Sequence, residues 1–138
     1  MNAVAITITN VPSELARVGT LVDRFAAENQ MSSDETADLQ VALDEILTNI
    51  IKYGYTDERA HEISVRLVIE SGILVVTIED DGRAFDPLTL PEPDVNAPLQ
   101  KRRPGGLGVH FVRHLMTEVK YNRSANLNRL VLKRELKR

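Results

Sequence analysis

Four acids crowd into ten residues near the middle of the chain, in the stretch 78-IEDDGRAFDP-87. They follow an apolar, strand-like run, where like charges repel each other and lose hydration, which suggests that they serve a binding role. Asp80 stands where the strand ends and could accept a hydrogen bond from an exocyclic amine such as that of adenine. Gly82 would let a flat ring approach the backbone. The alternative is a plain Asp-Gly turn between two elements.

A second polar set lies within 39-LQVALDEILTNIIKYGY-55, a stretch with helical periodicity. Glu45, Asn49 and Tyr53 are four residues apart and therefore share one helix face. Asparagine and glutamate oxygens suit Mg²⁺, which is normally shared with phosphates. A glutamate one turn from that ion could also polarise a water or a hydroxyl. The alternative is a solvated polar stripe.

The third candidate is 105-GGLG-108, which opens a helical pattern and follows three basic residues, Lys101, Arg102 and Arg103. Backbone N–H groups at the N-terminus of a helix bind phosphate. The motif is not a Walker P-loop, because no Gly-Lys-Ser/Thr follows, and it is not a Rossmann fingerprint, because no strand directly precedes it. By itself it could also be only a turn and a cap.

Metal and thiol chemistry receive little support. His110 and His114 are four residues apart, a spacing that can bind metal, but no third ligand is evident, so we expect surface positions for both. The chain has no cysteine, which excludes a disulfide scaffold, a zinc-thiolate site and a thiol nucleophile.

The elements that must position these residues follow from periodicity and turn signals. We expect strands at 3–9, 62–70, 73–79, 117–122 and 129–136, and helices at about 12–29, 35–53 and 105–119. Ser32, Ser33 and Asp34 are cap residues, and Ser71-Gly72 predicts a hairpin. Five prolines fall between residues 81 and 104, which predicts a long loop. This order predicts an α+β fold of two layers, with helices on one face of a mainly antiparallel or mixed sheet.

Length and charge narrow the function classes. The 138 residues suit one domain, and the net charge of −3 argues against a nucleic-acid partner. The N-terminus lacks the features of a signal peptide, and no stretch approaches the ~20 apolar residues of a membrane span. We therefore expect a cytoplasmic, single-domain protein.

Taken in order, the three motifs resemble the N, G1 and G2 boxes of the GHKL (histidine kinase-like, Bergerat-fold) ATPase superfamily. Within it, the stretches 41-VALDEILTNIIKYGY-55, 80-DDGRAFDP-87 and 105-GGLGVHFVRHLMTEV-119 look like the anti-sigma factor serine/threonine kinase family. The resemblance covers about residues 4–136. It implies one ATPase domain over residues 1–138, with an ATP lid at about 84–104.

The resemblance also implies roles for individual residues. Glu45 would be the general base, Asn49 would hold Mg²⁺, and Asp80 would accept from the adenine amino group. The remaining nucleotide-binding positions would be Gly82, Ala84, Phe85, Arg103, Gly105, Gly106, Leu107 and Gly108. Of these, the last four would cradle the phosphates, Arg103 would reach the terminal phosphate, and Phe85 would shape the base of the lid together with Asp86.

Three positions depart from the family pattern. Ala84 stands where a second glycine is usual, and Tyr53 stands where a histidine is common. Relatives often carry a glycine and then a threonine near the adenine, where this chain has 126-NLNRLVL-132. Val131 cannot donate the hydrogen bond that a threonine would donate, and Asn128 is the candidate to replace it.

The family implies an ATP- and Mg²⁺-dependent protein kinase that regulates transcription by partner switching. It would restrain a sigma factor and phosphorylate a serine of an anti-anti-sigma (STAS) protein. One alternative is a nucleotide-sensing binding module without phosphotransfer. Another is the ATP-binding domain of a two-component histidine kinase. A homodimer is possible, and the first strand and helix could supply its surface.

Overall fold

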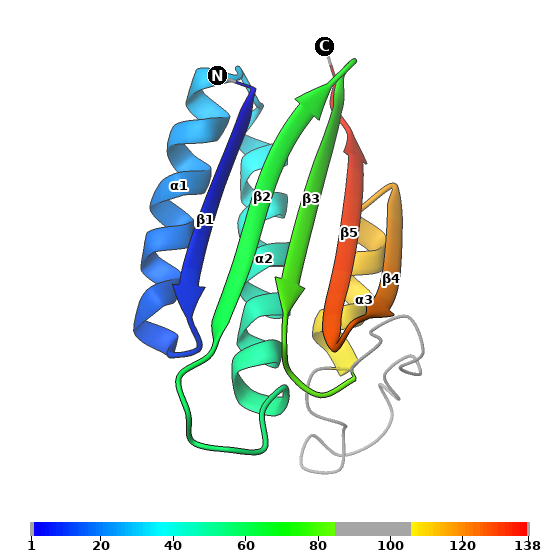
Figure 1. Cartoon of the computed structure of the whole chain (residues 1–138). Helices are drawn as coiled ribbons and strands as arrows, with labels where there is room; N and C mark the ends of the chain where they lie inside the picture. Colours follow the sequence, from blue (N-terminus) through cyan, green and yellow to red (C-terminus); the bar gives the residue numbers. More distant parts are fainter. Residues whose placement is uncertain (1, 85–105, 138) are drawn as a thin grey trace.

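The computed structural model describes residues 2–84 and 106–137, with only the backbone described for 106–110. Five strands form one sheet, and three helices lie together on one of its faces (Figure 1). The strands are β1 (Ala3–Thr9), β2 (Glu62–Glu70), β3 (Ile73–Asp80), β4 (Glu118–Ser124) and β5 (Leu127–Glu135). The helices are α1 (Leu15–Glu28), α2 (Ser33–Tyr53) and α3 (Gly106–Leu115), and a 3-10 turn, η1 (Pro12–Glu14), precedes α1. The expected two-layer α+β architecture is confirmed.

The strand order is β1-β2-β3-β5-β4, and each neighbouring pair is antiparallel. The β2–β3 and β4–β5 hairpin turns each place two consecutive residues at positive φ, as tight hairpins require. Ser71 and Gly72 have φ of 52° and 76°, which confirms the expected hairpin between β2 and β3. Ala125 and Asn126, at 53° and 65°, form a second such turn between β4 and β5 that the sequence patterns did not predict.

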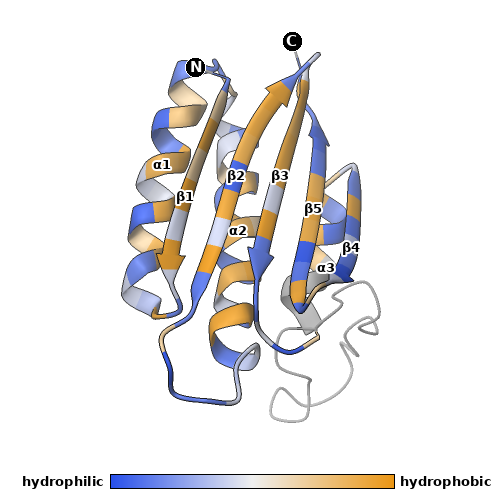
Figure 2. Ribbon diagram, viewed as in Figure 1, coloured by the Kyte–Doolittle hydropathy of each residue, from blue (hydrophilic) through white to orange (hydrophobic). Residues whose placement is uncertain are grey.

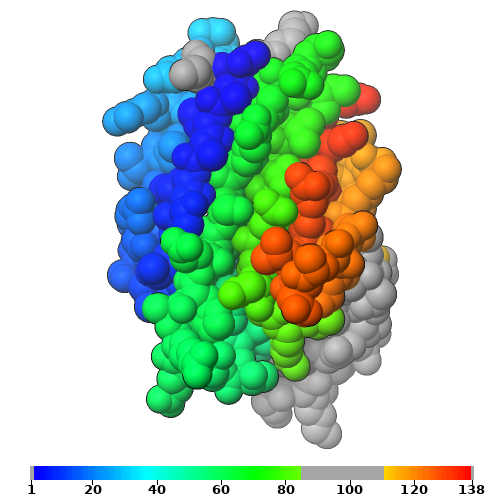
Figure 3. All heavy atoms as spheres, viewed as in Figure 1, coloured from blue at the N-terminus to red at the C-terminus, as the bar shows by residue number. Residues whose placement is uncertain are grey.

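Period-two alternation decides which face of each strand is buried. In β3 the side chains of Leu74, Val76, Ile78 and Asp80 point to the helix layer and are buried. Figure 2 shows the apolar run of β3 giving way to polar residues at its end. No helix of the described residues covers the opposite face of the sheet, and its strands lie side by side in the space-filling view (Figure 3).

The helices form because their apolar residues recur at three- and four-residue steps. On α1 the buried residues are Val18, Val22, Phe25 and Ala26, and on α2 they include Leu39, Leu43, Ile46, Leu47 and Ile50. The expected first helix begins three residues later than predicted, because residues 12–14 form the 3-10 turn instead. No helix in the described ranges is long and apolar enough to span a membrane.

Candidate nucleotide-binding site

The C-terminal end of α2, the end of β3 and the start of α3 lie at the same end of the molecule (Figure 1). Direct backbone contact joins the first two. The N–H of Arg83 donates to the carbonyl of Gly54 at 2.7 Å, and Nε of Arg83 donates to the carbonyl of Tyr53 at 2.6 Å. Two of the three predicted motifs are therefore in contact although they are far apart in sequence, and the start of α3 lies at the same end of the molecule.

Gly82 has no room for a side chain, because the backbone at the end of α2 lies very close to it. A Cβ on Gly82 would lie 2.4 Å from the carbonyl oxygen of Gly54 and 2.9 Å from Oδ1 of Asp80. Neither distance is compatible with a real side chain. The sequence suggested that this glycine admits a flat ring. The structure adds a packing reason that holds without any ligand.

The polar face of α2 approaches this end of the fold. Asn49 is only 6 % exposed, and Glu45, one turn earlier, is half-buried. Within the described part of the chain, the buried Nδ2 of Asn49 has no hydrogen-bond partner. Buried amides are normally satisfied, so an orphaned one marks a place where a ligand could supply the partner. The neighbouring Asp44 is exposed, so the two adjacent acids differ in burial.

Asp80 is the buried acid at the end of β3, with 6 % of its surface exposed. Its Oδ1 accepts from the backbone N–H of Gly82 at 2.9 Å and from Nδ2 of Asn128 at 3.0 Å. Burial raises the pKa of Asp80 above its usual range, while these two hydrogen bonds oppose the rise. A buried carboxylate held in this way can act as a fixed hydrogen-bond acceptor.

The structure corrects the expectation about Val131. Asn128, Leu130 and Leu132 are the buried residues of β5, so Val131 points to the open face, where it pairs with Thr77. Its lack of a hydrogen-bond donor therefore has no effect on the site. Asn128 is the residue of β5 that faces Asp80, since the two are register partners.

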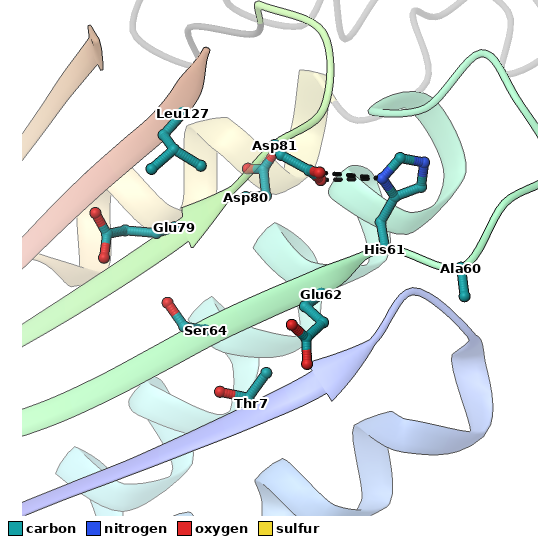
Figure 4. Close-up of a pocket in the computed structure, with 9 residues that line it drawn as sticks. All are labelled: Thr7, Ala60, His61, Glu62, Ser64, Glu79, Asp80, Asp81 and Leu127. Carbon is teal, nitrogen blue, oxygen red and sulfur yellow. Dashed lines mark hydrogen bonds and ion pairs between the residues drawn. The ribbon is translucent and has the colours of Figure 1, made fainter. Parts of the chain in front are cut away.

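A histidine fixes the loop beside this end of β3. His61 lies 3.1 Å from Oδ1 of Asp81 through Nδ1 and 2.8 Å from Oδ1 of Asp57 through Nε2. The His61–Asp81 contact is drawn in Figure 4, at the edge of a pocket of about 450 Å³. Most of that pocket is lined by residues of the open sheet face, such as Ser64 and Glu79, and Asp80 also lines it, at the end of β3.

Other predicted site residues are only partly placed. Gly106, Leu107 and Gly108 form the first turn of α3, as the helix-start prediction requires. Ala84 is exposed just after the end of β3. Phe85, Asp86, Lys101, Arg102, Arg103 and Gly105, with most of the expected lid, lie outside the described residues. His114 is exposed, and the described residues hold no cluster of three potential metal-binding side chains.

The chain belongs to the histidine kinase-like ATPase domain family, whose model matches residues 8–134. The two-layer fold, the buried aspartate at the end of β3 and the polar face of α2 are consistent with this class of protein. The crystal structure of the RsbU and RsbW domains of Rv1364c from Mycobacterium tuberculosis superposes with a TM-score of 0.70. It covers 100 % of this chain and 33 % of that one, at 16 % identity, and so supports the fold alone.

Within the family, the chain is similar to serine-protein kinases. It is 32 % identical to the serine-protein kinase RsbW of Listeria monocytogenes, over 70 % of this chain and 64 % of the relative. It is 30 % identical to RsbW of Bacillus velezensis, over 80 % and 73 %. The serine/threonine-protein kinase BtrW of Bordetella bronchiseptica is 28 % identical, over 80 % and 78 %. The chain thus spans 64–78 % of the length of these relatives, and less than two-thirds of the Listeria protein.

Sequence reasoning missed part of the network around Asp80. Tyr121 and Arg123, on β4, both donate to Oδ1 of Asn128. The sequence had already made Asn128 a candidate, and period-two alternation supports that choice because Asn128 is a polar residue in phase with Leu130 and Leu132. No local signal in the sequence points to Arg123, which is exposed and reaches the site only because β4 pairs with β5.

Proposed function

We propose that this chain is an ATP-dependent serine/threonine protein kinase of the anti-sigma factor type. The observation that carries the proposal is that the C-terminal end of α2, the helix with the buried Asn49, contacts the turn that follows the buried Asp80 at the end of β3. The named relatives, which are serine-protein kinases, support the same activity. The family itself already implies nucleotide binding.

Each of these side chains has a distinct proposed task. Asp80 accepts a hydrogen bond from the adenine amino group, and Glu45 takes the proton of the substrate hydroxyl as it attacks. The N–H groups at the start of α3 hold phosphate oxygens, and Gly106 and Gly108 leave the backbone there without bulky side chains. Catalysis then depends mainly on positioning and on electrostatic stabilisation, as in other phosphoryl transfers.

The residues present fit a shared Mg²⁺–phosphate site. Asn49 would offer its amide oxygen to Mg²⁺, which in phosphoryl transfer neutralises charge on the phosphates. Its buried Nδ2, which lacks a partner in the described ranges, could then donate to a phosphate oxygen. A buried amide whose nitrogen lacks a partner suits an ion–phosphate pair better than an ion alone, because an N–H donor cannot bind Mg²⁺.

The proposed partners follow from the same family resemblance. The phosphorylated substrate is a serine of an anti-anti-sigma (STAS) protein, and the restrained partner is a sigma factor. The nucleotide in the site would decide which of the two is held. A homodimer remains part of this proposal.

The test is transfer of labelled γ-phosphate from ATP to candidate STAS proteins in the presence of Mg²⁺, with phosphoserine located by mass spectrometry. Replacing Glu45 by Gln removes the base while keeping its size. Glu45→Gln should lower the transfer rate about 10²- to 10⁴-fold. ADP affinity, measured by calorimetry, should stay near that of the wild type, because Glu45 is not assigned to nucleotide binding.

Asp44→Asn is the matched control, since it removes the same charge from the exposed neighbour on α2. It should leave both transfer and affinity unchanged. Nucleotide binding by the wild type without transfer to any STAS protein would contradict the kinase activity. That result would favour a nucleotide-sensing module that only sequesters its partner.

A further inference from the structure

Both polar atoms of the Asn128 side chain, Oδ1 and Nδ2, take part in hydrogen bonds. It is 5 % exposed and lies on β5 directly across from Asp80 on β3. Its Nδ2 donates to Oδ1 of Asp80 at 3.0 Å, to the carbonyl of Arg83 at 2.8 Å and, more weakly, to the carbonyl of Gly82 at 3.4 Å. A buried side chain that links three groups at the end of β3 fixes their relative positions.

The surroundings permit only one orientation of this amide. Two donors, the phenol of Tyr121 and Nη1 of Arg123 (2.9 Å), face its oxygen. Acceptors alone face its nitrogen. Turning the amide over would set its nitrogen against Nη1 of Arg123, which can only donate, and its oxygen against three acceptors. The network therefore defines the orientation of Asn128 from both ends.

This orientation determines which oxygen of Asp80 is left for a ligand. Oδ1 already accepts from Nδ2 of Asn128 and from the N–H of Gly82. Across residues 2–84 and 106–137, no group of the chain donates to Oδ2 of Asp80. With one oxygen held by two donors, the carboxylate cannot rotate freely, and Oδ2 presents a fixed acceptor.

Arg123 strengthens the same arrangement from a second direction. Its Nη1 also donates to the carbonyl of Gly82 at 2.9 Å, so the turn after β3 is tied to β4 as well as to β5. A fixed acceptor raises the affinity for a ligand that carries a donor opposite it. It lowers the affinity for a ligand that carries a carbonyl there, because two acceptors are then left unpaired.

We propose that Asn128 is a positioning residue that holds Asp80 so that Oδ2 selects a purine with an exocyclic amine over one with a carbonyl at that place. The inference rests on the proposed binding of adenine nucleotides at Asp80 and adds the determinant of base choice. Tyr121 and Arg123 act through Asn128 by orienting its amide. None of these three residues needs to touch the nucleotide.

The test compares calorimetric affinities for ADP and for inosine diphosphate, in which a carbonyl replaces the amine, with Mg²⁺ present. Asn128→Leu keeps the size of the side chain and removes its hydrogen bonds. The ratio of ADP affinity to inosine diphosphate affinity should fall about tenfold or more, the loss expected for a hydrogen bond to a charged group. Asn122→Leu, the same change at an exposed position of β4, should leave the ratio unchanged.

A second variant keeps Asn128 in place. Tyr121→Phe combined with Arg123→Met removes both donors to Oδ1, frees the amide to turn over, and should lower the same ratio. Equal losses of affinity for both nucleotides, or an unchanged ratio in both variants, would overturn the positioning role. A wild type that binds neither nucleotide would instead overturn nucleotide binding itself, and this inference with it.

Discussion

At the scale of single residues, His61 is the clearest titrating contact. Its ring lies between two carboxylates and stacks on Tyr55 with a centroid distance of 4.4 Å. Hydrogen bonds to Asp57 and then to Asp81 raise the pKa of His61 above 6.5. The protonated ring thus ties the loop after α2 to the end of β3.

The consequence for stability has a definite sign. Because folding raises the pKa of His61, the stabilisation is fully present below pH 6.5 and is lost as pH rises through the folded pKa. We expect the thermal midpoint of the wild type to exceed that of His61→Gln at slightly acidic pH, and the difference to shrink above pH 6.5. Thermal unfolding followed by circular dichroism across this range measures it.

The control for this prediction removes the acids instead of the histidine. In a background of Asp57→Asn and Asp81→Asn, adding His61→Gln should give a difference in thermal midpoint that no longer depends on pH in this way. A wild-type advantage that grows with rising pH would contradict the assigned protonation.

At the scale of elements, the start of α2 carries a complete capping box. Oγ of Ser32 accepts from the N–H of Glu35 at 3.0 Å, and Oε1 of Glu35 accepts from the N–H of Ser32 at 2.9 Å. The other oxygen of Glu35 accepts from the backbone of Lys137 at 2.7 Å. Glu35 is only 4 % exposed, so one buried acid both starts α2 and holds the segment after β5.

This double role predicts an order of effects on the free energy of unfolding. Ser32→Ala should cost about 1 kcal/mol, the usual loss for an N-cap. Glu35→Ala should cost more, about 2–3 kcal/mol, because two backbone N–H groups lose a charged acceptor. Ser33→Ala, at the exposed next position, should stay within about 0.5 kcal/mol. Urea unfolding of the three variants tests the order, and equal costs for Ser32 and Glu35 would contradict it.

At the scale of the whole molecule, the close contact between Gly54 and Gly82 joins the helix layer to the end of the sheet. Gly82→Ala places a Cβ 2.4 Å from a backbone oxygen, which cannot move aside as a side chain could. We expect a loss of about 1–3 kcal/mol in the free energy of unfolding, as in other overpacked sites. Nucleotide affinity should fall as well, since Asp80 would be displaced.

Gly19→Ala is the matched control for that substitution. A Cβ on Gly19 would lie 3.6 Å from Oε1 of Gln40, an ordinary contact, within the helix α1. Because alanine favours helix over glycine, this variant should be more stable than the wild type by about 0.5–1 kcal/mol. Opposite signs for the two changes would separate close backbone packing from a general effect of Gly→Ala.

The sequence by itself determined the elements and their order. Alternation identified β2 and β3, the three- and four-residue steps identified α1 and α2, and the cap residues at 32–34 marked where α2 begins. These signals are local, because they record which side of a helix or strand avoids water. For the same reason the predicted positions of Asp80 and Asn49 on their elements hold in the structure.

Only the tertiary structure decided how those elements meet. The pairing of β3 with β5 sets Asn128 against Asp80 and turns Val131 away, and the pairing of β4 with β5 brings in Arg123. Strand register depends on packing between segments 48 residues apart, as the Asp80–Asn128 bond is, and a shift of one residue would reverse every side chain. The sequence identified Asp80 as a candidate residue, but only the fold decided that Asn128 lies against it.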